Sequence, residues 1–187
     1  MSRSAVRRCL FALVLAWTAA TPALADVEAN AASVFMQAGV GEDAVRVASV
    51  GVAWGVPWPG PIYRTYGVST RLELFASGWR TRVGGGEHRW LLQAGLVPVL
   101  RVRFDDGRSP WFAEGGIGLS LLNAELRTPG RTFGTRLNFS DNLGVGRNFG
   151  VQGEHEVSLH FQHTSNAGIR KPNPGLDLLM LRYARRF

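Results

Sequence analysis

The sequence predicts an all-β protein, an eight-stranded antiparallel transmembrane β-barrel of the bacterial outer membrane. Several stretches of ten or more residues alternate between apolar and polar side chains, a length that suits a tilted strand crossing a bilayer. The chain ends on Phe187, with Leu179, Leu181 and Tyr183 at alternate positions before it, an ending typical of outer-membrane barrels. Aromatic residues gather near the ends of the alternating stretches, as in an interfacial girdle; they are Trp54, Trp58, Tyr63, Tyr66, Trp79, Trp90 and Trp111.

Residues 1–25 have the features of a secretory signal peptide. Arginines precede an apolar run, residues 9–17, that is too short to span a bilayer. Ala23-Leu24-Ala25 then matches the small-x-small pattern of a cleavage site. We therefore expect one barrel domain over residues 26–187.

The expected mature chain is basic and free of cysteine. Cleavage removes three arginines and no acidic residue, which lowers the formal net charge from +7 to +4. The only cysteine, Cys9, leaves with the signal peptide, so we expect no disulfide and no thiol nucleophile. Nearly all of the remaining positive charge is arginine, whose planar guanidinium suits bidentate contacts to phosphate. The sequence contains no nucleic-acid-binding motif, and we expect no nucleic-acid partner.

The expected strands follow one another with turn signals between them. Residues 34–40 and 44–56 form the first two, and Trp58-Pro59-Gly60-Pro61 follows as a turn. Residues 66–80 alternate regularly until Gly84-Gly85-Gly86 breaks the chain.

The next three strands are separated by equally clear turns. Residues 88–104 form a long strand that ends at Asp105-Asp106-Gly107. Residues 111–122 alternate again and lead into a polar loop, and residues 133–149 form the sixth strand. An eight-stranded barrel is filled by side chains, so we expect interior charge pairs rather than a pore. The residues expected in these pairs are Arg71, Glu73, Arg101, Arg103 and Glu114.

The seventh and eighth strands form a hairpin within residues 157–183, around a loop rich in Asn, Gly and Pro. A symmetric hairpin centred on Arg170 places His163 opposite Asp177, and opposed residues of an antiparallel pair point to the same side. His163, Ser165 and Asp177 then share the most hydrophobic face, which faces lipid. Three polar groups on such a face indicate chemistry.

This arrangement predicts ester hydrolysis. Ser165 is the expected nucleophile, His163 the general base and Asp177 the carboxylate that orients the imidazole. The loop supplies candidate donors to an oxyanion, namely the backbone N–H groups of Asn166, Ala167 and Gly168 and the side-chain amide of Asn173.

The expected orientation places this site at the outer leaflet. Both termini of an even-stranded barrel of this type lie in the periplasm, so the loop between the last two strands is extracellular. The expected extracellular segments are mostly basic, with Glu42 and Asp43 of opposite sign; the basic residues are Arg80, Arg82, Arg89, Arg127, Arg131, Arg170 and Lys171. This balance favours an anionic, phosphate-bearing lipid, with Arg170 and Lys171 as candidate phosphate contacts.

Simpler interpretations stay open. A bare His-x-Ser also occurs by chance, and Asp177 could be a boundary charge that only reaches water. His155-Glu156-x-x-x-His160 misses the zincin spacing by one residue and lies on a strand, so we expect no metal. Two other functions remain: a non-catalytic small outer-membrane barrel, as an adhesin or membrane-stabilising protein, and a soluble periplasmic barrel that binds an apolar ligand.

The stretch from His163 to Gly175 resembles the PagL family of outer-membrane lipid A 3-O-deacylases. It reads His-x-Ser-Asn-Ala-Gly, then Pro-Asn-x-Gly and a closing strand, whereas the earlier strands match that family in pattern only. The resemblance implies an eight-stranded barrel with a Ser-His-Glu site on its outer wall. It makes His163 the general base and Ser165 the nucleophile, and Asp177 stands where the family usually has the longer Glu.

The resemblance also implies the reaction and the partners. The reaction is removal of the 3-hydroxyacyl chain that is ester-linked at position 3 of the proximal glucosamine of lipid A. It implies no metal or cofactor. The expected partners are lipopolysaccharide as substrate and the outer membrane, and homodimerisation stays open.

Overall fold

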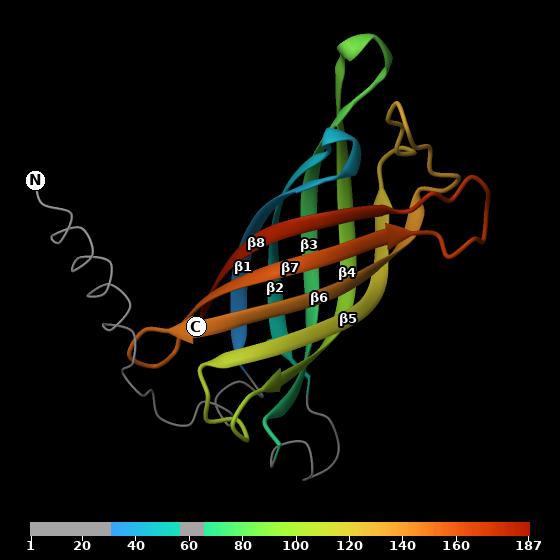
Figure 1. The fold of residues 1–187 in the computed structure, drawn as a ribbon. Coiled ribbons are helices and arrows are strands. Elements are labelled where there is room, and N and C mark those ends of the chain that lie inside the picture. The colour runs from blue at the N-terminus through green and yellow to red at the C-terminus, as the bar shows by residue number, and fades with distance from the viewer. Residues whose placement is uncertain (1–30, 57–65) are drawn as a thin grey trace, which may run out of the picture.

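The computed structural model describes residues 31–56 and 66–187, and the chain forms a closed barrel of eight antiparallel strands (Figure 1). Each strand pairs with the next one in the chain, and β8 closes the barrel on β1. The strands are β1 Ala32–Gly41, β2 Arg46–Gly55, β3 Val68–Arg82, β4 His88–Arg103, β5 Trp111–Leu122, β6 Leu137–Phe149, β7 His155–Ser165 and β8 Leu176–Arg186. The predicted fold class is confirmed, and the expected signal peptide lies outside the described residues.

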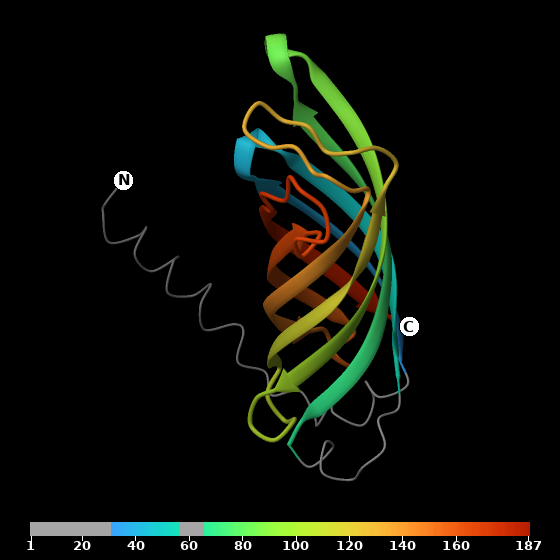
Figure 2. The same ribbon diagram turned by 90° about the vertical axis from the view of Figure 1, so that its right-hand side faces the viewer.

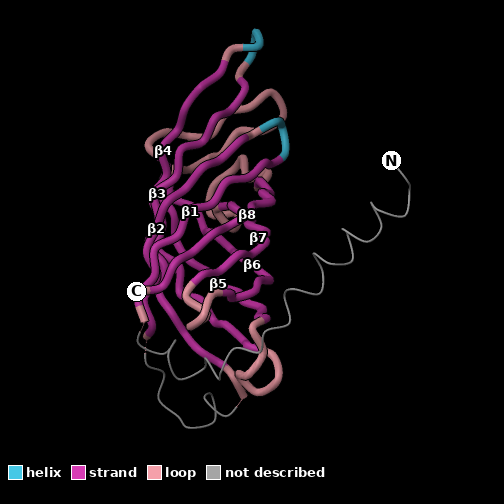
Figure 3. The backbone as a smooth tube through the Cα atoms, turned by 90° about the vertical axis from the view of Figure 1, so that its left-hand side faces the viewer, coloured by secondary structure: helices cyan, strands magenta, loops and turns pink. Residues whose placement is uncertain are grey.

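The connections β1–β2, β3–β4, β5–β6 and β7–β8 gather at one end of the barrel, where the β3–β4 hairpin reaches furthest (Figure 2). Two of them contain short 3-10 turns, η1 Glu42–Ala44 and η2 Gly84–Gly86, which are the only helical segments of the described residues (Figure 3). None of the helical segments described is long and apolar enough to cross a membrane.

The sixth strand begins later than the sequence predicted. Residues 133–136 belong to the β5–β6 connection, and β6 starts at Leu137. Phe133 turns inward and is 1% exposed, so its burial in the apolar cluster draws this segment away from the ladder. The next residue, Gly134, donates its N–H to the Pro172 carbonyl at 2.8 Å, which joins this connection to the β7–β8 loop.

Side chains fill the middle of the barrel with charge pairs, as predicted. Arg71 and Arg101 each approach Glu114 Oε2 at 2.7 Å, and Arg182 pairs with Glu73 at 2.8 Å. A buried carboxylate or guanidinium is tolerated only when a partner compensates its lost hydration, and these pairs supply that compensation. Above them, toward the clustered loops, lies an apolar cluster of Val45, Val47, Trp79, Leu91, Leu122, Leu126, Phe133, Leu176, Leu178 and Met180.

The outer surface is apolar, and four of the predicted girdle aromatics lie on it. Trp54, Tyr66, Trp90 and Trp111 are 37%, 60%, 66% and 49% exposed. Trp79 is not in the girdle, and that prediction is wrong. Its position on β3 has inward parity, and the buried indole donates to Gln93 Oε1 at 3.1 Å. The remaining two predicted girdle residues, Trp58 and Tyr63, lie outside the described residues.

Candidate active site

The β7–β8 hairpin has the register that the sequence predicted. His163 pairs directly with Asp177 across the two strands. Both side chains point outward and are partly exposed, 38% for His163 and 44% for Asp177. They continue a row of exposed apolar side chains on the same face of β7, Val157, Leu159 and Phe161. The two residues therefore lie on the outer wall of the barrel, at the end where the loops gather.

The His163 imidazole is fixed from two sides. Its Nδ1 lies 2.6 Å from Asp177 Oδ1, a distance expected for a strong hydrogen bond to a carboxylate. With Nδ1–H donated to Asp177, Nε2 is left as the basic nitrogen. The other constraint is Gly175, where a Cβ would lie 2.7 Å from Cε1 of the ring. Gly175 also has a φ of +66°, so glycine is required there for both backbone and packing reasons.

Ser165 is the last residue of β7, two residues beyond His163. Its Oγ lies 3.5 Å from the backbone N of Ala167. Within the part of the chain that the structure describes, no hydrogen bond joins Ser165 Oγ to the imidazole. Catalytic hydrogen bonds are often long before substrate binds and shorten in the complex, so this geometry is compatible with a nucleophile and its base.

The loop after Ser165 is held by two asparagines. Asn166 is 2% exposed, and its N–H donates to Asn173 Oδ1 at 2.9 Å. Its side-chain amide donates to the Arg170 carbonyl at 2.8 Å, and its Oδ1 accepts from Gly168 N–H at 3.0 Å. The N–H groups of Asn166 and Gly168 therefore serve the loop itself. Of the candidate oxyanion donors, this leaves the Ala167 N–H and the Asn173 side-chain NH2.

Ala167 adopts a left-handed backbone conformation with a φ of 51°. Such a conformation is uncommon for alanine and costs free energy, and residues held this way concentrate at functional sites. Here it turns the N–H of Ala167 back toward Ser165 Oγ. This is the position from which a donor can stabilise charge on an acyl carbonyl bonded to that oxygen.

A salt-bridge network braces the loop from outside. Arg131, in the β5–β6 connection, donates to the Gly175 carbonyl at 2.9 Å and pairs with Glu42 at 2.7 Å and with Asp43 at 3.4 Å. Glu42 also accepts the backbone N–H of Asp177 at 3.3 Å. Arg131 is thus committed to protein contacts and not free for lipid, unlike the exposed Arg170 and Lys171.

Two residues of β6 also face the site, and sequence reasoning missed them. Asp141 pairs with His163, and Phe139 pairs with Ser165. Asp141 thus lies on the side of the imidazole opposite Asp177. The sequence could have indicated Asp141, because it is an acidic residue on the same strand face as the apolar residues Leu137, Leu143 and Val145. Among the described residues, no group of three or more His, Cys, Asp or Glu is placed to hold a metal ion.

The chain is similar to known proteins in sequence and in structure. Residues 48–186 match the family model described as "Lipid A 3-O-deacylase (PagL)". The chain is 34% identical to the lipid A deacylase PagL of Bordetella bronchiseptica over 118 residues, which are 62% of this chain and 61% of that protein. It is 28% identical to the lipid A deacylase PagL of Pseudomonas aeruginosa over 171 residues, 91% of this chain and 95% of that protein. A crystal structure of the outer membrane enzyme PagL superposes with a TM-score of 0.66 at 25% identity, covering 82% of this chain and 98% of that one.

Proposed function

The chain belongs to the PagL family of lipid A 3-O-deacylases, and we infer from this that it removes the acyl chain ester-linked at position 3 of lipid A. The reaction takes place in the outer leaflet of the outer membrane. We place the active site on the lipid-facing wall because His163 Nδ1 and Asp177 Oδ1 lie 2.6 Å apart there. On a lipid-facing wall an apolar pair would often be at least as stable as this contact, which favours a chemical role for it.

Acylation of the enzyme is the first half of the proposed reaction. Ser165 Oγ attacks the ester carbonyl carbon while Nε2 of His163 takes the hydroxyl proton. Asp177 keeps the imidazole in the required tautomer and stabilises the imidazolium. The Ala167 N–H stabilises the oxyanion of the tetrahedral intermediate. The bond to the sugar oxygen then breaks, and the imidazolium gives its proton to that oxygen, which leaves a free sugar hydroxyl and acylated Ser165.

Deacylation reverses these roles. His163 takes a proton from water, the resulting hydroxide attacks the acyl-enzyme, and the tetrahedral intermediate expels Ser165 Oγ, which regains its proton from His163. The products are a 3-hydroxy fatty acid and lipid A shortened by one chain. All the proton transfers use groups of this chain, so no metal or cofactor enters the proposed mechanism.

Asp177 can take the place of the glutamate that is usual in the family. The orienting carboxylate needs only to reach Nδ1, and direct pairing of positions 163 and 177 brings it to 2.6 Å without the extra methylene. Arg170 and Lys171, which are exposed in the same loop, are proposed to contact the lipid A phosphates. An arginine is suited to bidentate contact with a phosphate, and the lysine adds a point charge.

The experiment is mass spectrometry of lipid A from cells that express the wild type or the Ser165→Ala variant. We expect lipid A to lose the mass of one hydroxyacyl chain only with the wild type. A matched control is Ser158→Ala, because Ser158 Oγ lies 3.0 Å from His160 Nε2 in a serine–histidine pair buried inside the barrel, which no lipid reaches. Identical spectra from the wild type and Ser165→Ala would contradict the assignment and favour a non-catalytic barrel.

A further inference from the structure

A groove with a floor of small side chains crosses the outer wall over β1–β4, and its two ends are lined by residues of β7 and β8 and of β5. Strand pairing aligns Ala38, Ala48 and Gly78 in one row across β1, β2 and β3. The next row lies toward the end of the barrel away from the clustered loops, here called the periplasmic end. It contains Ala76 on β3, which is paired with Ala94 on β4. Larger apolar side chains would fill this space with their own atoms, as they do on the rest of the wall.

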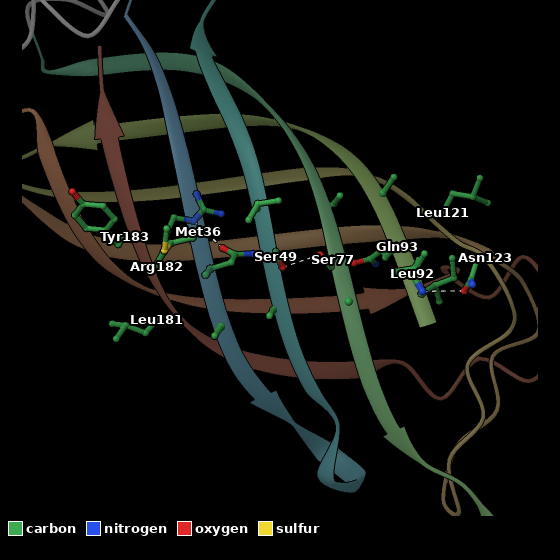
Figure 4. A pocket seen from close by; sticks show the side chains of 18 of the residues that line it. Met36, Ser49, Ser77, Leu92, Gln93, Leu121, Asn123, Leu181, Arg182 and Tyr183 are labelled. Carbon is green, nitrogen blue, oxygen red and sulfur yellow. Dashed lines mark hydrogen bonds between the residues drawn. The ribbon is translucent and has the colours of Figure 1, made fainter. Parts of the chain in front are cut away.

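The groove has the size of a lipid-binding site. Its volume is about 1040 Å³, and Figure 4 shows Leu181 and Tyr183 at one end and Leu92 and Leu121 at the other. It continues toward the periplasmic end as a hollow of about 620 Å³, lined in part by Val52. From Arg46 to Val52 the strand extends by about 20 Å at roughly 3.3 Å per residue, which is enough for an extended acyl chain.

Arginines rim the end of the groove that lies toward the clustered loops. Arg46 on β2 is paired directly with Arg80 on β3, one row above Ala48 and Gly78. Trp90, paired with Arg80 from β4, closes the row, and its ring comes within 3.8 Å of the position of a Gly78 Cβ. Arg82 and His88 form the next pair outward, toward the loop.

No contact in the described part of the chain compensates the charges of Arg46 and Arg80. Like charges opposite each other on a sheet destabilise the strand pair. Among the described residues, Arg46, Arg80 and Arg82 have no ion-pair or hydrogen-bonding partner for their guanidinium groups, and Glu42 is already paired with Arg131. A phosphate between the two guanidinium groups would relieve the repulsion and accept hydrogen bonds from both.

The rim lies around the barrel wall from the candidate active site. Arg46 lies two strands from β8, and Arg80 three strands, which is about 10 and 14 Å around the barrel at roughly 4.8 Å per strand. The candidate catalytic side chains lie on β7 and β8, and the site extends to β6, in the opposite direction around the wall.

We propose that this surface binds a second molecule of phosphorylated lipid A, which is not turned over, with a phosphate between Arg46 and Arg80 and an acyl chain in the groove. The positive charge of the two arginines favours an anionic lipid. Because the rim lies at the loop end of the barrel, that lipid would come from the leaflet next to the extracellular loops. The proposal rests on the outer-membrane location in the proposed function but not on the chemistry of Ser165.

The test is native mass spectrometry of the purified Ser165→Ala protein in detergent, titrated with bisphosphorylated lipid A. This variant does not consume the lipid, so occupancy is read directly. We expect two lipid A molecules per chain. The additional double substitution Arg46→Gln and Arg80→Gln should weaken one of the two binding events by about tenfold or more, since it removes two charge-assisted contacts. The same substitutions in the active enzyme should leave kcat unchanged.

A matched control carries Arg108→Gln and Arg185→Gln, which remove the same charge from the periplasmic end and should leave both binding events intact. Lipid A without phosphates should bind only once, and phosphatidylglycerol should not replace lipid A at the second site. Two equal binding events in the Arg46/Arg80 variant, equal binding of phosphatidylglycerol, or a second copy of the chain seated on this face would each overturn the proposal. If the proposed function fails instead, wild-type protein leaves lipid A intact while the arginine-dependent binding persists.

Discussion

Replacing Gly175 by alanine tests whether the backbone beneath the imidazole sets its position. The new Cβ would lie 2.7 Å from His163 Cε1, whereas ordinary contact begins at 3.4 Å, so the ring must move by about 0.7 Å. The ring is also held by its 2.6 Å hydrogen bond to Asp177, which this movement would lengthen or bend. Misplacement of a catalytic group by about 1 Å can cost roughly 100-fold in rate. We therefore expect kcat to fall about 10- to 100-fold.

The substitution also carries a backbone cost, which needs its own control. Gly175 has a φ of +66°, and an alanine there costs roughly 1–2 kcal/mol of folding free energy. Gly85 has a φ of +79°, and its Cβ would meet nothing within 4 Å. Gly85→Ala should therefore lower thermal stability by a similar amount without changing the rate.

The assay is release of the hydroxy fatty acid from purified lipid A in detergent, quantified by mass spectrometry, beside thermal unfolding followed by circular dichroism. The reasoning is refuted if Gly175→Ala and Gly85→Ala have equal rates. It is also refuted if Gly175→Ala loses activity only in proportion to the protein that has unfolded.

Substitutions at three further residues, Asp177, Arg131 and Asn166, test the loop and the orienting carboxylate. Asp177→Asn should lower kcat by about 10²- to 10⁴-fold through the wrong imidazole tautomer, and Asp177→Glu should retain most of the rate; equal loss in both would contradict an orienting role. Arg131→Gln removes the contacts of this arginine with the Gly175 carbonyl and with Glu42, so we expect faster proteolysis of the β7–β8 loop and a lower kcat. The control is Arg127→Gln, which should change neither, because the exposed Arg127 side chain pairs only with Glu125 among the described residues. Asn166→Ala leaves loop donors and acceptors unpaired, at about 1–3 kcal/mol, and should lower thermal stability together with activity; a fully active, equally stable variant would show that the loop is held by other contacts.

The sequence alone determined the hairpin and the face of its polar residues. Side chains on a strand alternate with a period of two, so the outward parity of His163 and Ser165 follows from the apolar residues at Leu159 and Phe161. A loop centred on Arg170 then fixes the register, and the structure has His163 opposite Asp177 as predicted. The face of a strand on which a residue lies depends only on its position among its neighbours in the sequence, so it can be predicted without the tertiary structure.

The tertiary structure decided which groups from distant segments meet at these positions. Trp79 is interior although aromatics near strand ends favour the girdle, and Phe133 leaves the ladder for the core. Arg131, Glu42 and Asp141 come to the hairpin from three other parts of the chain, and Arg46 meets Arg80 only through the pairing of β2 with β3. These contacts depend on the shear and closure of the whole barrel, which set the register between neighbouring strands. The sequence contains no periodic pattern from which that register can be predicted.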